Sequence, residues 1–250
     1  MLTIVSFECV RKEMVSIKLG ENFVVGVFLE RVNRFTVRVR LPEGDVLAHL
    51  PNSGRLKTTL IPGSAAFLTI KNQPSRKTQY DLFAVEHDKI PIIVDTRFSN
   101  LAARKTAEWK MHERLRDFKV VKENIAVNNS RLDMLLQSGA RRFFLEVKSV
   151  THVLNGVALF PDAPTQRGRK HLRHLMKLRK QGHQTGILFS VQRPDAKVLQ
   201  PNQEVDPEFT ALLRKAVDEG LHVFSQTLLF KYGKHPSVEI KVDAPAFRFP

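Results

Sequence analysis

Three charged residues, Asp133, Glu146 and Lys148, lie in a segment whose pattern predicts a β-hairpin. The stretches on either side of Gly139-Ala140 are rich in apolar residues, and the residues between them are typical of a tight turn. If Gly139 and Ala140 form the two-residue tip of a type II′ turn, Asp133 lies directly opposite Glu146. Because side chains alternate along a strand, Lys148 shares the face of Glu146.

This arrangement favours a site for a divalent cation. Two carboxylates that face each other repel, and Mg²⁺ or Mn²⁺ between them would remove the repulsion. Lys148 would then lie beside the attacking water. The alternative is an exposed, salt-linked cluster, because Asp…Glu-x-Lys is a loose pattern. The apolar stretch 153–160 predicts a further strand. Together with the apolar neighbours Leu145 and Val147, it instead indicates the middle of a buried sheet, where charges need partners.

A basic segment follows the hairpin. Residues 165–181 predict a helix with a buried stripe of Leu172, Leu175 and Met176. Between Pro164 and Pro194 the chain has eight Lys or Arg and no Asp or Glu. Because like charges one turn apart destabilise a helix, we expect one basic face either to bind an anion or to remain solvated. The residues of that face recur at helical spacing: Arg169, Arg173, Lys177 and Lys180.

The predicted start of this helix could also hold a phosphate. Helix N-termini offer free N–H groups and the positive end of the dipole, and Thr165, Arg167 and Gly168 lie there. His171 and His174 follow, but no second ligand cluster accompanies them, so a structural zinc site is not favoured. The preceding Asp162 is either an extra acid near the metal or part of a rigid turn.

Composition points to a polyanionic partner. The chain of 250 residues has 40 Lys plus Arg and 25 Asp plus Glu, a net charge of +15 and a pI near 10.2. Such a field attracts nucleic acid, although a generally basic proteome would give the same number. With one cysteine, no signal-peptide pattern and no apolar run long enough to span a bilayer, we expect a cytoplasmic protein without membrane contact.

The first third of the chain predicts a small β-barrel. About five short strands alternate with turn signals over residues 1–83. The stretch 35–40 alternates, which places Arg38 and Arg40 on the polar face. These two and Arg55 could follow phosphates, or belong to an ordinary solvated surface. The Pro-Asn-Ser-Gly sequence at 51–54 is either a turn or a site.

The remainder predicts a mixed α/β domain. Ser99 or Asn100 could cap a helix over residues 101–118, and strands and helices then alternate. Asp206 and Pro207 are typical of the start of a helix, and Gly220 of its end. The boundary between the two domains is expected near residue 85.

Four motifs together resemble the sugar fermentation stimulation protein A family, and the resemblance spans about residues 5 to 230; they are LPNSGRL, SRLD, FLEVKSVT and LFPDAPTQRGRKHLRHL. The hairpin itself resembles the core of the PD-(D/E)xK nucleases, with Asp133 as the first acid and Glu146-Val147-Lys148 as the E-x-K motif. The resemblance implies an OB-type barrel at 1–85 and a nuclease-like α/β domain at 86–250.

The resemblance also implies roles for residues. Asp133, Glu146 and Lys148 would be catalytic, and the metal ligands would be Asp133, Glu146, the Val147 carbonyl and Glu123 as a further acid. His171 matches the histidine of the family's RG-x-x-HL motif. Together with the charge pattern, this gives the expected nucleic-acid-binding residues: Arg38, Arg40, Arg55, Arg131, Thr165, Arg167, Gly168, Arg169, His171, Arg173 and Lys177.

Two functions follow from these observations. The first is a Mg²⁺- or Mn²⁺-dependent nuclease acting on DNA, with single strands or RNA as alternatives and no small-molecule cofactor. The second is a non-specific DNA-binding regulator of sugar catabolism with a catalytically silent nuclease fold. A sugar-processing enzyme is disfavoured by the charge and by the lack of an aromatic sugar platform. The sequence does not determine the oligomeric state.

Overall fold

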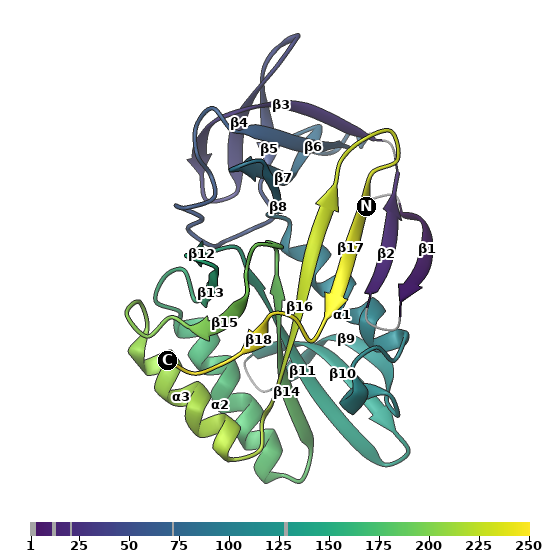
Figure 1. Cartoon of the computed structure of the whole chain (residues 1–250), viewed down its shortest axis with the longest axis vertical. Helices are drawn as coiled ribbons and strands as arrows, with labels where there is room; N and C mark the ends of the chain where they lie inside the picture. Colours follow the sequence, from purple (N-terminus) through teal and green to yellow (C-terminus); the bar gives the residue numbers. More distant parts are fainter. Residues whose placement is uncertain (1–3, 12–13, 21, 72, 128–129) are drawn as a thin grey trace. The chain divides into compact units, whose positions relative to one another are not determined.

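A computed structural model describes the chain except residues 1–3, 12–13, 21, 72 and 128–129 (Figure 1). The segment tested above for a signal peptide therefore lies partly outside the described residues. The chain forms two compact units. Unit 1 comprises Met1–Phe98, Gln192–Pro194 and Leu228–Lys241, and unit 2 comprises Ser99–Val191, Asp195–Thr227 and Val242–Pro250. Each unit thus combines separate segments, whereas the sequence-based proposal gave each domain one continuous segment.

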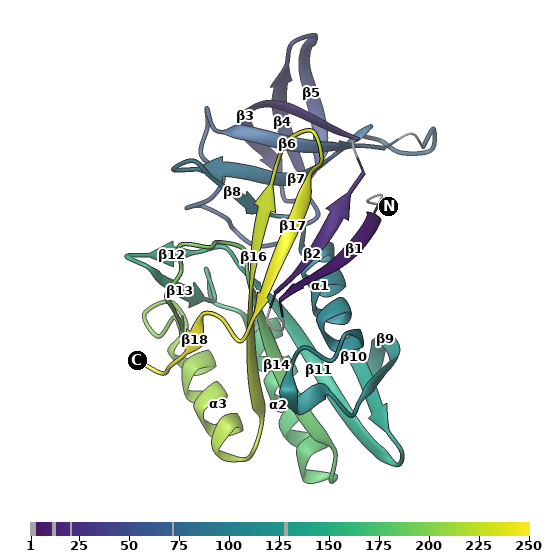
Figure 2. The same cartoon turned by 45° about the vertical axis from the view of Figure 1, so that its right-hand side comes forward.

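The barrel of unit 1 has the expected OB-type topology. Its six-stranded sheet has the order β5-β4-β3-β6-β7-β8, and a parallel pairing of β5 with β7 closes it (Figure 2). The last strand, β8, lies beyond residues 1–83, over which the strands of the barrel were predicted. The strands are β3 (Phe23–Asn33), β4 (Thr36–Leu41), β5 (Gly44–His49), β6 (Ala65–Ile70), β7 (Tyr80–His87) and β8 (Ile90–Ile93).

Every second side chain of β4 lies in the barrel core. Val37 and Val39 are buried in its core, while Arg38 and Arg40 lie on the outer side, as predicted. Gly26 is required on β3, because a Cβ atom there would lie 2.5 Å from the Arg40 carbonyl oxygen. Unit 1 also includes β1 (Ile4–Arg11), β2 (Met14–Leu19) and β17 (Ser237–Val242) up to Lys241, and β2 pairs with both of the others.

The loop around the Pro-Asn-Ser-Gly sequence is held by side chains of its own unit. Asn52 is buried; its Oδ1 accepts from the Gly54 N–H at 2.8 Å, and its Nδ2 donates to the Val94 carbonyl at 2.9 Å. Arg31 donates to the Gly54 and Arg55 carbonyls at 2.6 and 2.9 Å. These contacts account for the turn chemistry of the motif.

A buried ionic cluster lies beside β7. Asp81 is fully buried; its Oδ1 accepts from Arg76, and its Oδ2 accepts from Arg97 at 2.7 Å. Arg97 also donates to Asp95, and the Lys71 ammonium lies 4.0 Å from Asp81. Burial lowers the pKa of Lys71, although Asp81 partly offsets this effect.

Unit 2 is built on a mixed sheet in the order β16-β14-β11-β10-β9 (Figure 1). The pairings of β9, β10 and β11 are antiparallel, whereas β14 is parallel to both β11 and β16. This confirms the predicted mixed α/β domain. The strands are β9 (Lys119–Val127), β10 (Ser130–Ser138), β11 (Arg141–Val150), β14 (Gln184–Val191) and β16 (His222–Lys231), and residues 228–231 of the last belong to unit 1.

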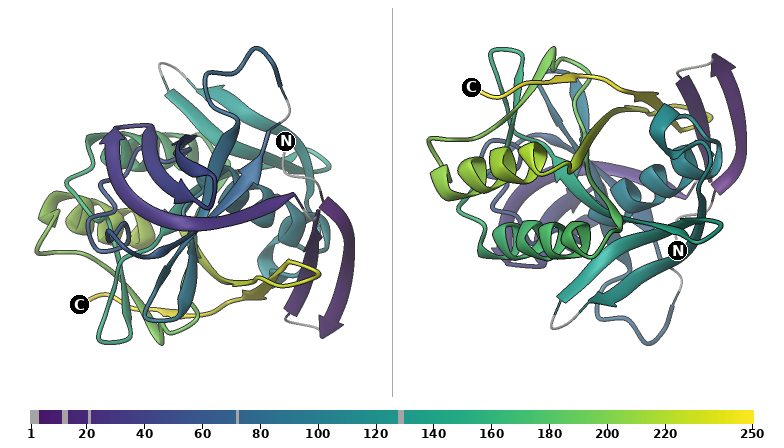
Figure 3. Two further views of the ribbon diagram at one scale, coloured as in Figure 1. Left: turned by 90° about the horizontal axis from the view of Figure 1, so that it is seen from above. Right: turned by 90° about the horizontal axis from the view of Figure 1, so that it is seen from below.

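Helices cover both faces of this sheet. α2 (Gln166–Lys180) and α3 (Pro207–Asp218) lie side by side and share a core with Phe144 and Phe189 (Figure 3). On the other face, α1 (Thr96–Glu108) and the short η1 (Glu113–Leu115) pack on Leu145 and its neighbours. A small second sheet contains β12 (Val153–Leu154), β13 (Val157–Phe160), β15 (Val198–Pro201) and β18 (Ala246–Phe247).

Two predicted elements differ from the structure. α1 begins at Thr96 and ends at Glu108, so Ser99 and Asn100 lie inside it and cap nothing. The Asp95 carboxylate instead accepts from the Arg97 N–H at 2.9 Å. The stretch 153–160 is a hairpin and not one strand, because Asn155 and Gly156 both have positive φ, as a type I′ turn requires.

One carboxylate secures the starts of α2 and α3. Asp206 Oδ1 accepts from the Phe209 N–H at 2.9 Å, which confirms the predicted cap of α3, and Oδ2 accepts from the Thr165 N–H at 2.7 Å. Thr165 Oγ1 in turn accepts from the Gly168 N–H at 3.0 Å. A Cβ atom at Gly168 would lie 2.7 Å from Thr165 Cγ2, so only glycine fits there. None of the helices in the described part of the chain is long and apolar enough to cross a membrane.

Candidate metal and catalytic site

The predicted hairpin register is confirmed for the five pairs nearest the turn, and the predicted pair of Asp133 with Glu146 is not among them. The ladder of β10 and β11 runs from Met134↔Leu145 to Ser138↔Arg141, with Gly139 at φ +56° in the tip. Asp133 is the next residue of β10 beyond this ladder. On β11, Phe144 packs towards α2 and α3, while Leu145 and Val147 pack towards α1. Alternation therefore directs Glu146 and Lys148 towards α2.

Asp133 binds the backbone of the opposing strand. Its Oδ2 accepts from the Val147 N–H at 2.8 Å, and its Oδ1 accepts from Asn100 Nδ2 of α1 at 3.2 Å. Burial raises the pKa of Asp133, and the nearby Glu146 carboxylate raises it further, to about 6. Lys148 and the two hydrogen bonds only partly offset this rise.

Glu146 is the most deeply buried acid of the site, at 2% exposure. Its Oε1 accepts from both Lys148 and His171, whereas its Oε2 has no hydrogen-bond partner among the described residues. Burial raises the pKa of Glu146, but Lys148 and His171 more than offset this and hold the pKa below its usual value. Glu146 is therefore a charged carboxylate with one unused buried oxygen.

His171 belongs to this cluster. It is buried on α2, its Nδ1 binds Glu146 Oε1, and Lys148 Nζ lies 3.3 Å from the same nitrogen. Because an ionised carboxylate only accepts, Nδ1 must carry the proton in that bond. Lys148 of β11 and His171 of α2 thus both contact Oε1 of Glu146. The sequence placed His171 among nucleic-acid-binding residues, and the structure adds its contact with the two E-x-K side chains.

The donor set fits a hard divalent cation. Asp133 and the free Glu146 Oε2 supply carboxylate oxygens, the donors that such ions prefer. In a strand the N–H and C=O of one residue point to the same edge, so the Val147 carbonyl also lies on the Asp133 side. Among the described residues, however, no group of three or more His, Cys, Asp or Glu side chains has metal-ligand spacing.

Glu123, the expected further acid, is not part of this cluster. It is exposed on β9, opposite Met134, and its nearest cation is Arg104 Nε at 3.7 Å. The exposed Asp162, the other candidate acid, precedes α2.

The structure divides the basic residues of α2. Arg169 is half-buried and forms ion pairs with Glu208 and with Asp206. Lys180 lies 3.9 Å from Glu219. Arg167, Arg173 and Lys177 are exposed. The predicted single basic face is therefore interrupted, because α3 supplies acids on one side. The backbone N–H groups of Thr165 and Gly168 already have partners, so they are not free for a phosphate.

The cations of the barrel are also partly paired. Arg38 lies 2.9 Å from Glu30, and Arg40 lies 2.9 Å from Asp45. Arg55 is exposed in the loop after β5, and Arg131 is exposed on β10 in unit 2.

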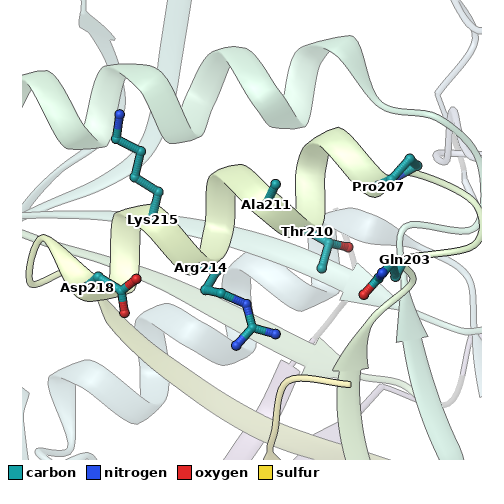
Figure 4. A pocket seen from close by; sticks show the side chains of 7 residues that line it. All are labelled: Gln203, Pro207, Thr210, Ala211, Arg214, Lys215 and Asp218. Atoms are coloured by element: carbon teal, nitrogen blue, oxygen red, sulfur yellow. The ribbon is translucent and has the colours of Figure 1, made fainter.

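A surface pocket on α3 does not coincide with the site. Its volume is about 500 Å³, and Figure 4 shows side chains of α3 lining most of it. The lining residues include no residue of the Asp133–Glu146 cluster: Gln203, Pro207, Thr210, Ala211, Arg214, Lys215 and Asp218.

Sequence reasoning missed Asn100 as a member of the site. It considered Asn100 only as a helix cap, because no local spacing relates this residue to Asp133. The contact becomes visible only when α1 is placed on the sheet.

Comparisons with known proteins agree with this architecture. Residues 97–233 match the model of the sugar fermentation stimulation protein RE domain, and residues 29–94 match the SfsA N-terminal OB domain. The chain belongs to this family. A sugar fermentation stimulation protein homolog of Thermoanaerobacter sp. is 38% identical over 205 residues, covering 82% of this chain and 89% of the relative. That of Methanothermobacter thermautotrophicus is 38% identical over 208 residues, covering 83% and 87%.

A solved structure of the SfsA family is also similar. Pyrococcus furiosus SfsA, in complex with Ca²⁺, is 30% identical, covers 89% of this chain and 94% of its own, and superimposes with a TM-score of 0.82. The fold of this chain is therefore an OB barrel followed by the mixed α/β domain that the family model and the Pyrococcus structure share with it.

Proposed function

We propose that this chain is a divalent-metal-dependent phosphodiesterase that acts on nucleic acid, with Mg²⁺ or Mn²⁺ as its ion. The observation that carries the proposal is the Glu146 carboxylate, which is charged, buried and leaves one oxygen without a hydrogen-bond partner beside Asp133 and Lys148. An unused buried oxygen is costly, and an ion that coordinates it would remove this cost. The Ca²⁺ in the related Pyrococcus structure supports an ion with oxygen ligands.

The ion would be held by Asp133, Glu146 and the Val147 carbonyl. Bound there, it would supply a Lewis acid that offsets charge on the scissile phosphate. The raised pKa of Asp133 and the lowered pKa of Glu146 distinguish the two acids before binding. The ion would stabilise the charged form of both.

Lys148 would act on the water and the phosphate, and His171 would hold Glu146 in position. The ammonium of Lys148 orients the attacking water and offsets negative charge on the phosphate. As the water oxygen bonds to phosphorus, the P–O bond to the leaving sugar oxygen breaks, and the water's proton passes to that oxygen. His171 holds Glu146 Oε1, and the Oε2 atom would then be available to the ion. The net charge of +15 supports nucleic acid as the polyanionic substrate.

The test compares cleavage and metal binding in matched variants. The parent should nick plasmid or cleave labelled oligonucleotides with Mg²⁺ or Mn²⁺ and not with chelator. Lys148→Ala leaves both carboxylates in place, so it should still bind metal and lose cleavage. Glu146→Gln should lose both. If the parent shows neither a metal-dependent melting shift nor cleavage of DNA or RNA at millimolar ion, the proposal is wrong.

The second candidate is a non-specific nucleic-acid-binding protein with a catalytically silent site. The absence of a three-side-chain ligand cluster among the described residues favours it, as does the engagement of Lys148 with Glu146. Nucleic-acid binding that persists in chelator, without any cleavage, would support this alternative. A regulatory role in sugar use would then rest on that binding.

A further inference from the structure

The two long sides of α2 differ in how their positive charges are neutralised. On the α3 side, Arg169 pairs with Glu208 and Lys180 approaches Glu219. In addition, Arg179 Nε donates to the Glu219 carbonyl at 3.4 Å. The cations of this side therefore have partners within the protein.

The opposite flank carries a row of basic residues, which we call the flank row: Arg167, Lys170, His174 and Lys177. Arg167 lies one turn before His171, and His174 lies nearly one turn after it, so the row runs beside the residue that contacts Glu146 and Lys148. Within the described residues, no acidic side chain lies within salt-bridge distance of Arg167 or Lys177.

The environment of His174 shows that these charges are close together. Burial lowers the pKa of His174, and Lys170, His171 and Lys177 lower it further. Its Nδ1 is buried without a hydrogen-bond partner among the described residues. Like charges at helical spacing destabilise a helix, so an external anion beside Arg167 and Lys177 would stabilise this flank.

We infer that the flank row binds the phosphodiester backbone of a nucleic-acid strand and leads it to Glu146 and Lys148. The inference rests on the proposed function for the identity of the partner, and it assigns the binding to the side of α2 away from α3. Figure 3, seen from below, shows α3 along one side of α2 only, and α2 packs on β10 and β11 near the site. The face predicted from sequence is thereby divided: Lys177 belongs to the row, and Arg169 does not.

The spacing suits a backbone contact. Arg167 and Lys177 are ten residues apart on a helix that rises about 1.5 Å per residue, so they span roughly 15 Å. Successive phosphates of one strand lie several ångströms apart, so such a row can contact more than one of them. Because these contacts neutralise charge and read no bases, the row should bind sequences alike.

The test is a charge-matched pair of double variants. Arg167→Gln with Lys177→Gln removes two charges from the flank row. Lys180→Gln with Lys215→Gln removes two from exposed positions on the α3 side of α2 and on α3. Binding of labelled single-stranded and duplex DNA is measured in chelator at several salt concentrations, so that cleavage plays no part. Melting temperatures check that both doubles fold.

The flank-row double should bind roughly tenfold more weakly than the parent, and its salt slope on duplex should be smaller by about 1.8, or two phosphate contacts. The control double should stay within about twofold of the parent. Equal losses in both doubles, or no loss in either, would overturn the inference.

Two further arms separate this inference from the proposed function. If the parent never cleaves but the flank-row double alone loses binding, the nuclease proposal fails and the row stands. If the parent cleaves while both doubles bind alike, the row fails and the nuclease proposal stands. Loss of binding to anionic vesicles, with nucleic-acid binding unchanged, would assign the row to a lipid surface and also overturn the inference.

Discussion

Two buried carboxylates, one in each unit, use their oxygens differently. In unit 1, Asp81 is fully buried, and each of its oxygens accepts from an arginine, Arg76 on one and Arg97 on the other. In unit 2, Glu146 is almost as buried, but Lys148 and His171 both bind its Oε1 and leave Oε2 unused. Both carboxylates lie next to cations, but of the two only Asp81 has a hydrogen-bond partner among the described residues on each of its two oxygens.

The difference separates a structural charge cluster from a binding site. A buried acid with partners on both oxygens has each oxygen hydrogen-bonded, and removing the acid leaves its cationic partners without a counter-ion. A buried acid with an unused oxygen has recovered only part of it, and a ligand can supply the rest. Counting the partners of each oxygen therefore says more than counting nearby charges.

The largest expected effect on stability concerns the ionic cluster around Asp81. Asp81→Asn removes the buried counter-ion of Arg76 and Lys71 and leaves Arg97 with Asp95 alone, so it should lower the free energy of unfolding by about 3–5 kcal/mol. Chemical denaturation monitored by circular dichroism measures this. Asp45→Asn, which breaks the exposed pair with Arg40, is the control and should leave the midpoint nearly unchanged. A similar midpoint in both variants would contradict the comparison.

The next largest effect concerns stabilisation by a metal ion at Asp133 and Glu146. Mg²⁺ or Mn²⁺ at 100 times its dissociation constant should stabilise the parent by about 2.7 kcal/mol, because the ion binds only the folded state. Asp133→Asn and Glu146→Gln should abolish this increment, and chelator should reverse it in the parent. Asp81→Asn should keep the full increment on its lower baseline. Thermal melting with and without ion distinguishes these results.

A smaller effect concerns pH in the metal-free protein. The pKa of Asp133 is about 6 in the folded chain, against an ordinary value of 3.8, so the folded state holds this proton more tightly. Stability from this group is present at low pH and is lost as pH rises through about 6. Asp133→Asn should therefore be more stable than the parent at pH 7.5, with the gap closing towards pH 4. Melting curves of both proteins in chelator measure the gap, and a gap that widens on acidification would refute the assignment.

The smallest effect concerns Asn100. Its hydrogen bond favours the charged form of Asp133, so Asn100→Ala should raise the pKa of Asp133 by a few tenths of a unit and change stability by less than about 1 kcal/mol. Carbon NMR of the aspartate carboxyl groups follows this titration directly. An unchanged or lowered pKa would show that Asn100 does not act on Asp133.

Local rules predicted much of unit 2 because its signals are short-range. The turn at Gly139-Ala140 determines the register of β10 and β11, and Asp206 with Pro207 determines the start of α3. The same kind of rule was available for Asn155-Gly156, a strong hairpin signal, but the apolar run around it was interpreted as one strand.

The rest depended on partners that are distant in sequence. Arg169 fits a basic helical face by spacing alone, and only the packing of α3 reveals that Glu208 neutralises it. Asn100 reaches Asp133 across 33 residues of sequence, and His171 reaches Glu146 across 25. The resemblance placed His171 near the site, but no spacing rule connects it to a particular oxygen.

Asp206 makes the first turns of α2 and α3 open together. Its two oxygens hold the amides of Thr165 and Phe209, which belong to different helices. Any fluctuation that frees this carboxylate exposes both amides to solvent at once, so their hydrogen exchange should proceed with one common opening constant. Since His171 lies less than two turns from Thr165, the same local opening would loosen its hold on Glu146. The start of α3 contributes no side chain to the candidate site, and we nevertheless expect its opening to loosen the contact between His171 and Glu146.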